Sequence, residues 1–314
     1  MAKYLLNRLY QMLILLLIVS LLSFLLVSLM PGDPVYSLYG MEITREEYEV
    51  YFKRLGLDQP VIVRYLNWLG NVLKGDFGVS YSYHRPVFEV IGAKLGTTLY
   101  LSVLALLISM PLGVLLGTIT AVRRGKAADT VITFFANTLI AVPQFVIAII
   151  FLYFITMKWR LLPAQGFTWP WVNFSKHIQQ LIMPLTCLTM GGIAGFCRQT
   201  RSSILEVLGQ DYVRTARAKG LKEIQIIKKH VMNNGLIPIL TLIGNRLAGL
   251  IGGSVFVENV FNIPGMGSLL IKSVNSMDMP VIQALVMITA LVISVAYIIT
   301  DILYVVVDPR ISLT

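Results

Sequence analysis

Six long runs of apolar residues dominate the pattern along the chain. A helix needs about 20 apolar residues to cross the roughly 30 Å of hydrocarbon in a bilayer, because each residue adds about 1.5 Å. The runs that reach this length are approximately residues 9–30, 95–122, 130–157, 178–197, 231–257 and 279–307. Only Arg246 interrupts the fifth run, and only Asp301 interrupts the sixth. The pattern predicts an all-α membrane protein with six transmembrane helices.

The first run resembles a secretory signal because Lys3 and Arg8 precede it. It is, however, about twice as long as the usual 7–15-residue apolar core, and no small-residue cleavage site follows it. We therefore expect an uncleaved first span.

The composition agrees with a membrane protein. The 314 residues are 56% hydrophobic and only 13% charged, whereas soluble domains are about 45–50% apolar and about 25% charged. The formal net charge of +10 is also typical of nucleic-acid-binding proteins. The charges lie between the apolar runs, and this placement argues against nucleic acid as a partner.

The distribution of Lys and Arg orients the predicted spans. Six spans place both termini on one side, where 14 Lys/Arg face 5 Asp/Glu and give a net charge of +9. The opposite side carries 11 Lys/Arg and 10 Asp/Glu. Because Lys and Arg concentrate on the cytoplasmic side of membrane proteins, we expect both termini in the cytoplasm.

This topology divides the chain into regions. They are an N-terminal transmembrane helix (1–30), an extracytoplasmic segment (31–94), a five-helix core (95–307) and a tail (308–314). The extracytoplasmic segment contains turn signals and a short amphipathic helix near 46–52. Within the core, Pro143 predicts a kink in the third span because it lacks an N–H. Glycine pairs four residues apart, including Gly113 with Gly117 and Gly191 with Gly195, predict close helix packing.

One cytoplasmic loop, residues 198–230, contains eight of the Lys and Arg residues. Asp211 is a suitable N-cap, and apolar positions then recur with a helical period until Gly220, which breaks the helix. A second basic amphipathic piece follows. Two short helices at an angle form a compact knob, and this organisation indicates a docking element for a partner.

Neither catalysis nor metal binding is indicated by the residues. The chain has no Gly-x-x-x-x-Gly-Lys-Ser/Thr phosphate-binding loop, so ATP hydrolysis is not expected here. The three histidines are distributed over both sides of the membrane and do not form one metal site. Cys187 and Cys197 lie ten residues apart on one predicted helix, which is too far for a disulfide.

Two charged residues within the predicted spans are candidates for the interior of the bundle. Placing an arginine such as Arg246 mid-membrane costs about 2.5–3.5 kcal/mol on insertion scales. Asp301 lies at a depth that permits an ion pair with Arg246, so a structural pair and a lining role for a path both stay open. Glu258 and Asn259, at the outer end of the fifth span, are candidates for a gate or a contact with an external partner. Gln144 is a further candidate for the path.

Four separate stretches give the chain a specific resemblance. They are residues 31–34 (Pro-Gly-Asp-Pro), 55–60 with 75–80, the loop at 212–221, and 257–267 followed by Asp-Pro-Arg-Ile at 308–311. In these motifs the chain resembles the permease subunits of ATP-binding-cassette (ABC) importers, in the dipeptide/oligopeptide permease B-subunit family of the peptide and nickel branch. The resemblance covers essentially the whole chain and implies the type I ABC importer permease fold.

The resemblance also implies roles for residues of the cytoplasmic loop. In this family the loop couples the permease to its ATPase and usually carries Glu-Ala-Ala, three residues, Gly, and later Ile-x-Leu-Pro. Gly220 matches the glycine, Arg214, Thr215 and Ala216 replace Glu-Ala-Ala, and residues 230–233 replace Ile-x-Leu-Pro. Asp211 and Glu223 are nearby carboxylates that can substitute for the missing acidic residue. The implied coupling residues are Asp211, Tyr212, Val213, Arg214, Thr215, Ala216, Arg217, Ala218, Lys219, Gly220 and Leu221.

The function implied by the resemblance is binding-protein-dependent import of dipeptides or oligopeptides across a bacterial or archaeal inner membrane. Nickel or a metal chelate is the alternative substrate, and a secondary transporter or channel is a more distant alternative. The implied partners are a second homologous permease subunit, two cytoplasmic ATPase subunits, an extracytoplasmic substrate-binding protein and membrane lipid. ATP and magnesium would bind to the ATPase subunits, and no cofactor is expected on this chain.

Overall fold

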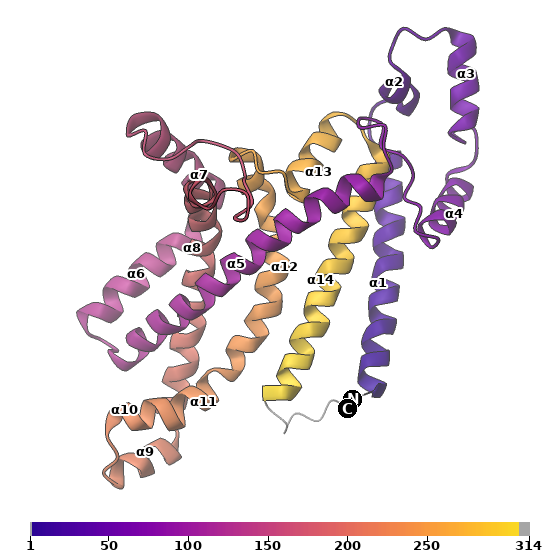
Figure 1. Cartoon of the computed structure of the whole chain (residues 1–314). Helices are drawn as coiled ribbons and strands as arrows, with labels where there is room; N and C mark the ends of the chain where they lie inside the picture. Colours follow the sequence, from indigo (N-terminus) through magenta and orange to yellow (C-terminus); the bar gives the residue numbers. More distant parts are fainter. Residues whose placement is uncertain (1, 308–314) are drawn as a thin grey trace. The chain divides into compact units, whose positions relative to one another are not determined.

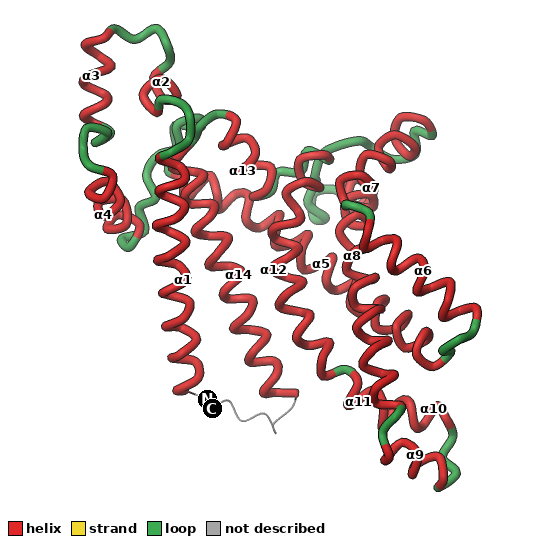
Figure 2. The backbone as a smooth tube through the Cα atoms, turned by 180° about the vertical axis from the view of Figure 1, so that it is seen from behind, coloured by secondary structure: helices red, strands yellow, loops and turns green. Residues whose placement is uncertain are grey.

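The computed structural model describes residues 2–307, and within this range the chain is helical apart from loops and one isolated β-bridge between Val79 and Pro86 (Figures 1 and 2). The chain divides into two compact units. Unit one contains the described residues up to 98 together with 264–295, and unit two contains 99–263 together with the described residues from 296. The motif at 308–311 and the predicted tail (308–314) lie outside the described residues.

Among the described residues, four helices are long and apolar enough to cross a membrane. They are α1 (Ala2–Ser28), α5 (Val87–Val122), α8 (Phe174–Leu208) and α14 (Met279–Val307). A bent pair of helices between α5 and α8 makes a fifth span if it is counted as one. The fifth predicted span corresponds in position to α12 (Ile237–Val260), which is not among these. The count of six and the cytoplasmic termini therefore remain predictions.

Several helices are longer than the apolar runs that predict them. Helix α5 begins at Val87 rather than at residue 95, and α8 extends beyond both ends of the predicted span at 178–197. The ends of α8 carry charged residues such as Lys176 and Arg201. Hydropathy reports the part of a helix that suits lipid, whereas the backbone hydrogen bonds continue into its polar ends.

In unit one, three short helices form most of the segment between α1 and α5: α2 (Pro34–Tyr39), α3 (Arg45–Arg54) and α4 (Val61–Val72). Helix α3 confirms the helix predicted near 46–52, and Thr44 and Glu47 close its N-terminus in a reciprocal capping box. The Tyr48 hydroxyl donates to an Asp33 carboxylate oxygen at 2.6 Å, and this hydrogen bond raises the pKa of Tyr48 to about 12.

Two contacts fix α4 against α1 within unit one. The hydroxyls of Ser20 and Tyr65 lie 2.9 Å apart in a buried hydrogen bond. The rings of Phe24 and Tyr65 meet edge to face, with centroids 5.6 Å apart. Because the two helices join through both a polar and an aromatic contact, the segment outside the predicted membrane region is anchored to the first span.

A buried carboxylate joins two loops of unit one. Asp278 is fully buried just before α14, and it accepts the Ser80 hydroxyl and the backbone N–H groups of Tyr81 and Ser82. The bonds to the two N–H groups are both 3.1 Å long. This carboxylate satisfies three donors of the turn that precedes α5, so it ties that turn to the loop between α13 (Met266–Asn275) and α14.

In unit two, the predicted kink at Pro143 is a complete break. Helix α6 (Ala127–Ala141) ends before it, α7 (Gln144–Phe151) starts after it, and the two helical axes differ by 97°. Val142 and Pro143 both have extended backbone angles. Proline removes a helical hydrogen bond and disfavours the helical conformation of the residue before it, and together these effects stop the helix. A π-helix, Leu152–Lys158, continues α7.

Glycines bring α5 and α8 into direct backbone contact. A Cβ on Gly113 would lie 2.7 Å from the Ile193 carbonyl oxygen, and one on Gly117 would lie 2.6 Å from the Thr200 Cβ. The close packing predicted from this pair is confirmed. Cys187 and Cys197 are both free and buried on α8, which agrees with the prediction that they form no disulfide.

We predict that Asp278→Asn destabilises the protein by about 1–3 kcal/mol, because an amide cannot accept from all three donors and leaves one of them buried without a partner. The melting temperature of the purified protein in detergent measures the change. Asp58→Asn, at an exposed aspartate, is the control and should change it little. Equal melting temperatures for the two variants would contradict the importance of the Asp278 contacts.

Candidate translocation pocket and coupling loop

Helix α8 is the element on which the candidate sites of unit two are built. It contacts α6, α7, α12 and the short α11 (Met232–Gly235), and Figures 1 and 2 show these helices around it from opposite sides. Asn173 caps its N-terminus by accepting the Lys176 N–H at 2.9 Å. One side of α8 contributes to a pocket, and its far end carries the coupling loop.

The pocket has a volume of about 300 Å³ and lies among α5, α7, α8 and α12. Its apolar wall consists of Leu188, Gly192, Leu242 and Gly249. Its polar groups come from three different helices and are Ser109, Gln144, Asn245 and Arg246. A hydroxyl, two amides and one guanidinium therefore face a small space inside a helical bundle, which suits a polar or anionic group.

Arg246 is the charged residue of this pocket. The described part of the chain places no carboxylate within ion-pair distance of it, and the charged group that acts on it is another cation, Arg198. The guanidinium occupies the space beside Gly195, where a Cβ would overlap it. The second predicted glycine pair thus faces the side chains of Arg246 and Gln144 rather than the backbone of a neighbouring helix.

Two of the predicted path residues, Gln144 and Arg246, meet in the pocket, and three do not. Of the two alternatives for Arg246 and Asp301, a mutual ion pair is not among the ion pairs of the described residues. Similar depth along two helices does not imply that the side chains face one another, because the rotation of each helix also matters. Asp301, Glu258 and Asn259 do not line the pocket.

The two residues predicted at the outer end of α12 differ in exposure. Glu258 is fully buried, and its carbonyl accepts the Ile263 N–H at 2.8 Å. The Glu258 side chain is therefore not at the surface in this conformation, and its predicted role as a gate or external contact stays a prediction. Asn259 is exposed, so its predicted contact stays a prediction.

Sequence reasoning missed Ser109 and Asn245 as pocket residues. Asn245 precedes Arg246 in an otherwise apolar run. A polar residue in such a run is a sequence signal from which Asn245 could have been predicted. Ser109 gives no such signal, since hydroxyls are common in membrane helices and bond to their own backbone, as Ser109 does to the Leu106 carbonyl at 3.4 Å. Its place opposite Gly192, where a Cβ would lie 2.7 Å from that of Ser109, follows from tertiary packing.

The loop at 198–230, which is the candidate coupling loop, contains the predicted knob of short helices. Helix α9 (Asp211–Ala218) is followed by α10 (Glu223–Ile226) and a π-helical turn, Ile227–Val231. Gly220 ends α9 with φ of +77°, the Gly220 N–H donates to Arg217, and the Leu221 N–H donates to Ala216. This is a Schellman motif, in which the left-handed residue is glycine because a Cβ is disfavoured there.

The N-terminus of α9 differs from its prediction. Gln210, not Asp211, is the N-cap, and its side chain makes no capping hydrogen bond. Asp211 is the first helical residue, where its negative charge suits the helix dipole. It also forms an exposed ion pair with Arg214 at 3.4 Å, one turn along the same helix.

Apolar side chains anchor the knob to the helices that bear it. Val213 and Ala216 of α9 are buried together with Ile226 and Val231. The same cluster contains Ile204 of α8 and Ala121 of α5. The knob is therefore packed onto the ends of two long helices, so a force on it moves them directly.

An ion pair bridges the turn at Gly220. The Arg217 guanidinium donates to both carboxylate oxygens of Glu223, at 2.8 and 3.4 Å, and this carboxylate raises the pKa of Arg217. Both side chains are exposed, so the pair contributes little to stability. The pair links the last turn of α9 to the first residue of α10.

The knob leaves apolar side chains uncovered on its outer surface. Tyr212 and Leu221 are about two-fifths exposed, and Ile224 is 57% exposed. A groove of about 480 Å³ runs beside Leu221 and Ile224 and is also lined by Lys228, Lys229 and His230. An apolar surface edged by cations is suited to a protein partner with acidic groups.

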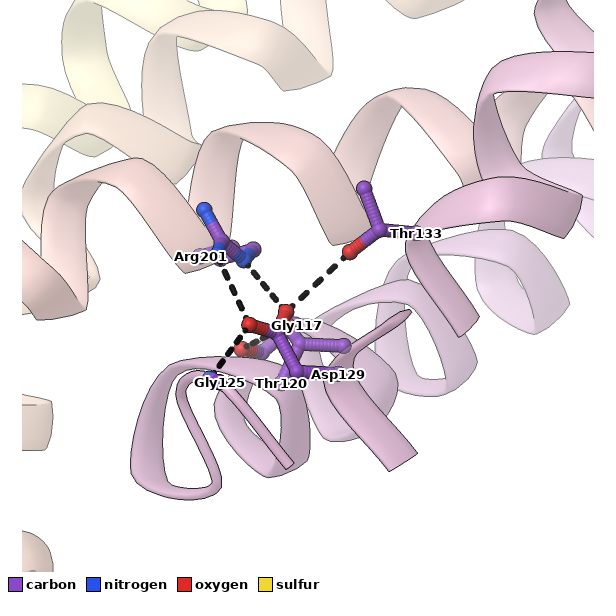
Figure 3. Close-up of polar contacts among 6 residues, drawn as sticks. All are labelled: Gly117, Thr120, Gly125, Asp129, Thr133 and Arg201. Atoms are coloured by element: carbon purple, nitrogen blue, oxygen red, sulfur yellow. Dashed lines mark hydrogen bonds and ion pairs between the residues drawn. The ribbon is translucent and has the colours of Figure 1, made fainter. Parts of the chain in front are cut away.

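A second polar cluster closes the end of α6 against α8 (Figure 3). Arg201 of α8 donates through two nitrogens to the carboxylate of Asp129, at 2.8 and 2.9 Å. The Asp129 carboxylate also accepts the Gly125 N–H at 3.0 Å and the Thr133 hydroxyl at 3.2 Å. Paired hydrogen bonds of this kind are the strongest form of contact between Arg and a carboxylate, and they hold the turn between α5 and α6 onto α8.

Within the described residues, no three His, Cys, Asp or Glu side chains gather to hold a metal.

The helical arrangement and the knob define the class of protein, the membrane subunit of an ABC importer. The chain is similar in fold to the methionine ABC transporter in inward-facing conformations, with a TM-score of 0.58, 16% identity, and coverage of 70% of this chain and 97% of that chain. A structure of an amino acid ABC transporter gives a TM-score of 0.51 at 18% identity and covers 71% of this chain and 94% of its own. These likenesses show the type I ABC importer permease fold.

The chain belongs to the family described as binding-protein-dependent transport system inner membrane components, whose model matches residues 113–313. The model of the N-terminal part of such membrane components matches residues 1–102. The protein is thus a multi-pass transport component of the inner membrane.

Two curated relatives match over nearly their whole length. The oligopeptide transport system permease protein AppB of Bacillus subtilis is 39% identical over 319 residues, covering 99% of this chain and 100% of the relative. The dipeptide transport system permease protein DppB of Lactococcus lactis is 37% identical over 314 residues, covering 100% of both.

We predict that Gly195→Ala displaces the Arg246 guanidinium and destabilises the protein by less than the usual overpacking cost of about 1–3 kcal/mol, because the new methyl group overlaps the far end of a flexible side chain. Gly249→Ala is the matched control, since a Cβ on this pocket glycine meets nothing within 4 Å. Melting temperatures in detergent compare the two variants. Adding Arg246→Gln to Gly195→Ala should recover most of the loss, and a double variant no more stable than Gly195→Ala would contradict the overlap.

We predict that Asp129→Asn costs about 1–3 kcal/mol, because it weakens charged hydrogen bonds to a carboxylate whose side chain is 9% exposed. The exposed pair of Arg85 and Glu89 supplies the control, and Glu89→Gln should cost less than about 1 kcal/mol. Denaturation of both variants in detergent gives the comparison. Similar losses for the two substitutions would show that the Asp129 cluster is no stronger than a surface pair.

Proposed function

We propose that the chain is a membrane subunit of an ATP-driven importer for dipeptides or oligopeptides, and that it forms half of the translocation path. The observation that carries this proposal is the full-length similarity to permeases named for oligopeptide and dipeptide transport. The same relatives favour peptides over nickel or a metal chelate. The chain itself performs no catalysis, and ATP with magnesium binds to partner subunits.

Four partners complete the transporter: a second homologous permease subunit, two cytoplasmic ATPase subunits and an extracytoplasmic substrate-binding protein. The family's dependence on a binding protein supports the last of these. The knob supports the ATPase contact, because Tyr212, Leu221 and Ile224 present apolar surface beside cations on the predicted cytoplasmic side. The coupling residues are those of the loop at 211–221.

The packing of unit two suggests how movement of the knob reaches the path. Val213 and Ala216 share a buried cluster with Ile204 of α8. About three to four turns before Ile204, α8 forms a wall of the pocket through Leu188 and Gly192. A helix transmits displacement along its axis, so an ATPase that moves the knob also moves this wall. Opening to alternate sides by shifts of packed helices is an established transport mechanism.

Within the pocket, Arg246 and Gln144 are the path residues that this mechanism would expose in turn. Asp301, Glu258 and Asn259 remain candidates for gating at lower rank, because they do not line the pocket. Reconstitution of the complete transporter, this chain with its four partners, in proteoliposomes tests the proposal as a whole. Uptake of radiolabelled peptide should require ATP, and unlabelled dipeptides or oligopeptides should compete with it while nickel should not. Nickel uptake without peptide uptake would overturn the peptide assignment.

We predict that Gly220→Val uncouples ATP hydrolysis from uptake. The left-handed conformation costs a residue with a Cβ about 1–2 kcal/mol, so α9 should end differently and the angle of the knob should change. The ratio of peptide taken up to ATP hydrolysed should fall several-fold while the permease remains folded.

Gly209→Ala is the control for this variant. Gly209 ends α8 in a right-handed conformation with φ of −81°, so alanine is tolerated there. An unchanged coupling ratio in Gly220→Val, together with normal co-purification of the ATPase subunits, would contradict the assignment of the loop.

A further inference from the structure

The pocket contains a cation without a counter-ion. Arg246 lies in a helical bundle where the described part of the chain gives it no ion pair, and its charged neighbour is another arginine, Arg198. Arg246 is half-buried; a charge that has lost part of its water without gaining a partner is costly, and charged residues within membrane segments usually serve a path or a ligand. The arrangement therefore disfavours the empty pocket and favours a state in which an anion occupies it.

A glycine leaves the space that the Arg246 guanidinium occupies. A Cβ on Gly195 would overlap the guanidinium. Two side-chain amides also line the pocket: Gln144 comes from α7, and Asn245 comes from α12. An amide can donate to an anion alongside arginine, and none of the described residues that line the pocket is acidic.

A helix end adds to this positive field. Helix α7 begins at Gln144, directly after the break at Pro143, and its N-terminus has no side-chain cap. The first N–H groups of a helix lack intrahelical acceptors and carry a partial positive charge. In transporters, interrupted helices often present such ends to anionic groups of the substrate. Gln144, the first residue of α7, lines the same pocket as Arg246, so the positive end of this helix lies near the guanidinium.

We propose that this pocket is a transit site for the C-terminal carboxylate of the peptide, held by Arg246 with Gln144 and Asn245. The inference rests on the proposed function, since the substrate is taken to be a peptide. A peptide has an ammonium at one end and a carboxylate at the other. The positive charge of Arg246 repels the ammonium and attracts the carboxylate. The carboxylate terminus is also common to peptides of any sequence, so the site recognises the class without selecting side chains.

The small volume of the pocket suits weak, transient binding of one end of the peptide. About 300 Å³ is at the lower limit of ordinary ligand pockets, so it holds the end of a peptide and not a long chain. One guanidinium and two amides give moderate affinity. A translocation site must bind its substrate weakly enough to release it, as in other membrane paths.

The test compares peptides that end in a free carboxylate with the same peptides ending in a carboxamide. The complete transporter in proteoliposomes, with its binding protein, is assayed for ATP-dependent uptake of both forms. The ratio of the two uptake rates is measured for the wild type, Arg246→Gln and Arg246→Lys. Because every variant uses the same binding protein, a change in the ratio reports the permease. Arg124→Gln, at an exposed arginine outside the pocket, is the control.

We expect the ratio of free acid to amide to fall about tenfold in Arg246→Gln, the range for losing a charged hydrogen bond. Arg246→Lys should keep most of the ratio, and the control should keep all of it. An unchanged ratio in Arg246→Gln overturns the carboxylate site. Loss of uptake of both forms by a folded Arg246→Gln protein overturns it as well, because amide uptake should survive.

A second variant covers the case in which Arg246→Gln does not fold. Gln144→Leu removes an amide of the same site, and it should lower the ratio of free acid to amide several-fold. The same ratio as the wild type would again overturn the carboxylate site. If the wild-type transporter takes up neither form of peptide, the proposed peptide import fails instead, so the two failures are distinguishable.

Discussion

Direct backbone contact between α5 and α8 is the constraint on which unit two depends. Gly113 and Gly117 leave no space for a side chain against the Ile193 carbonyl and Thr200. Lipid offers no hydrophobic gain for joining two apolar helices, so close approach and dispersion contacts supply the attraction. With α5 at this distance, α8 has its remaining faces free for α6, α7 and α12, and its length is enough to link the pocket to the knob.

Polar contacts complete the arrangement at places where packing alone is ambiguous. The paired hydrogen bonds of Arg201 with Asp129 fix the rotation of α8 relative to the turn before α6. In unit one, Asp278 has the same function for the turn at 80–82. Each carboxylate accepts several hydrogen bonds at once, from donors on a separate segment, so each specifies one arrangement more sharply than apolar contacts do.

Features that depend on neighbouring residues could be predicted from the sequence, and features that depend on distant residues could not. Gly220 and Pro143 act within a few residues, so the end of α9 and the interruption of the third span were predictable, although the full break of 97° was not. Arg201 and Asp129 are 72 positions apart, and no local pattern joins them. The placement of Arg246 beside Gly195 follows from the rotation of two helices, which hydropathy does not report. For the same reason the sequence left open whether Arg246 pairs with Asp301 or lines a path.

Because both native cysteines are buried, the protein is suited to chemical labelling at introduced cysteines. Cys187 and Cys197 are the only thiols in the sequence, and their exposed fractions are 0% and 2%. A bulky maleimide should react slowly with both, because the thiolate must reach solvent to attack. A single cysteine introduced at a pocket or knob position would then react against a low background without removal of the native residues. Its reactivity through the transport cycle would follow how water enters and leaves each part of the chain.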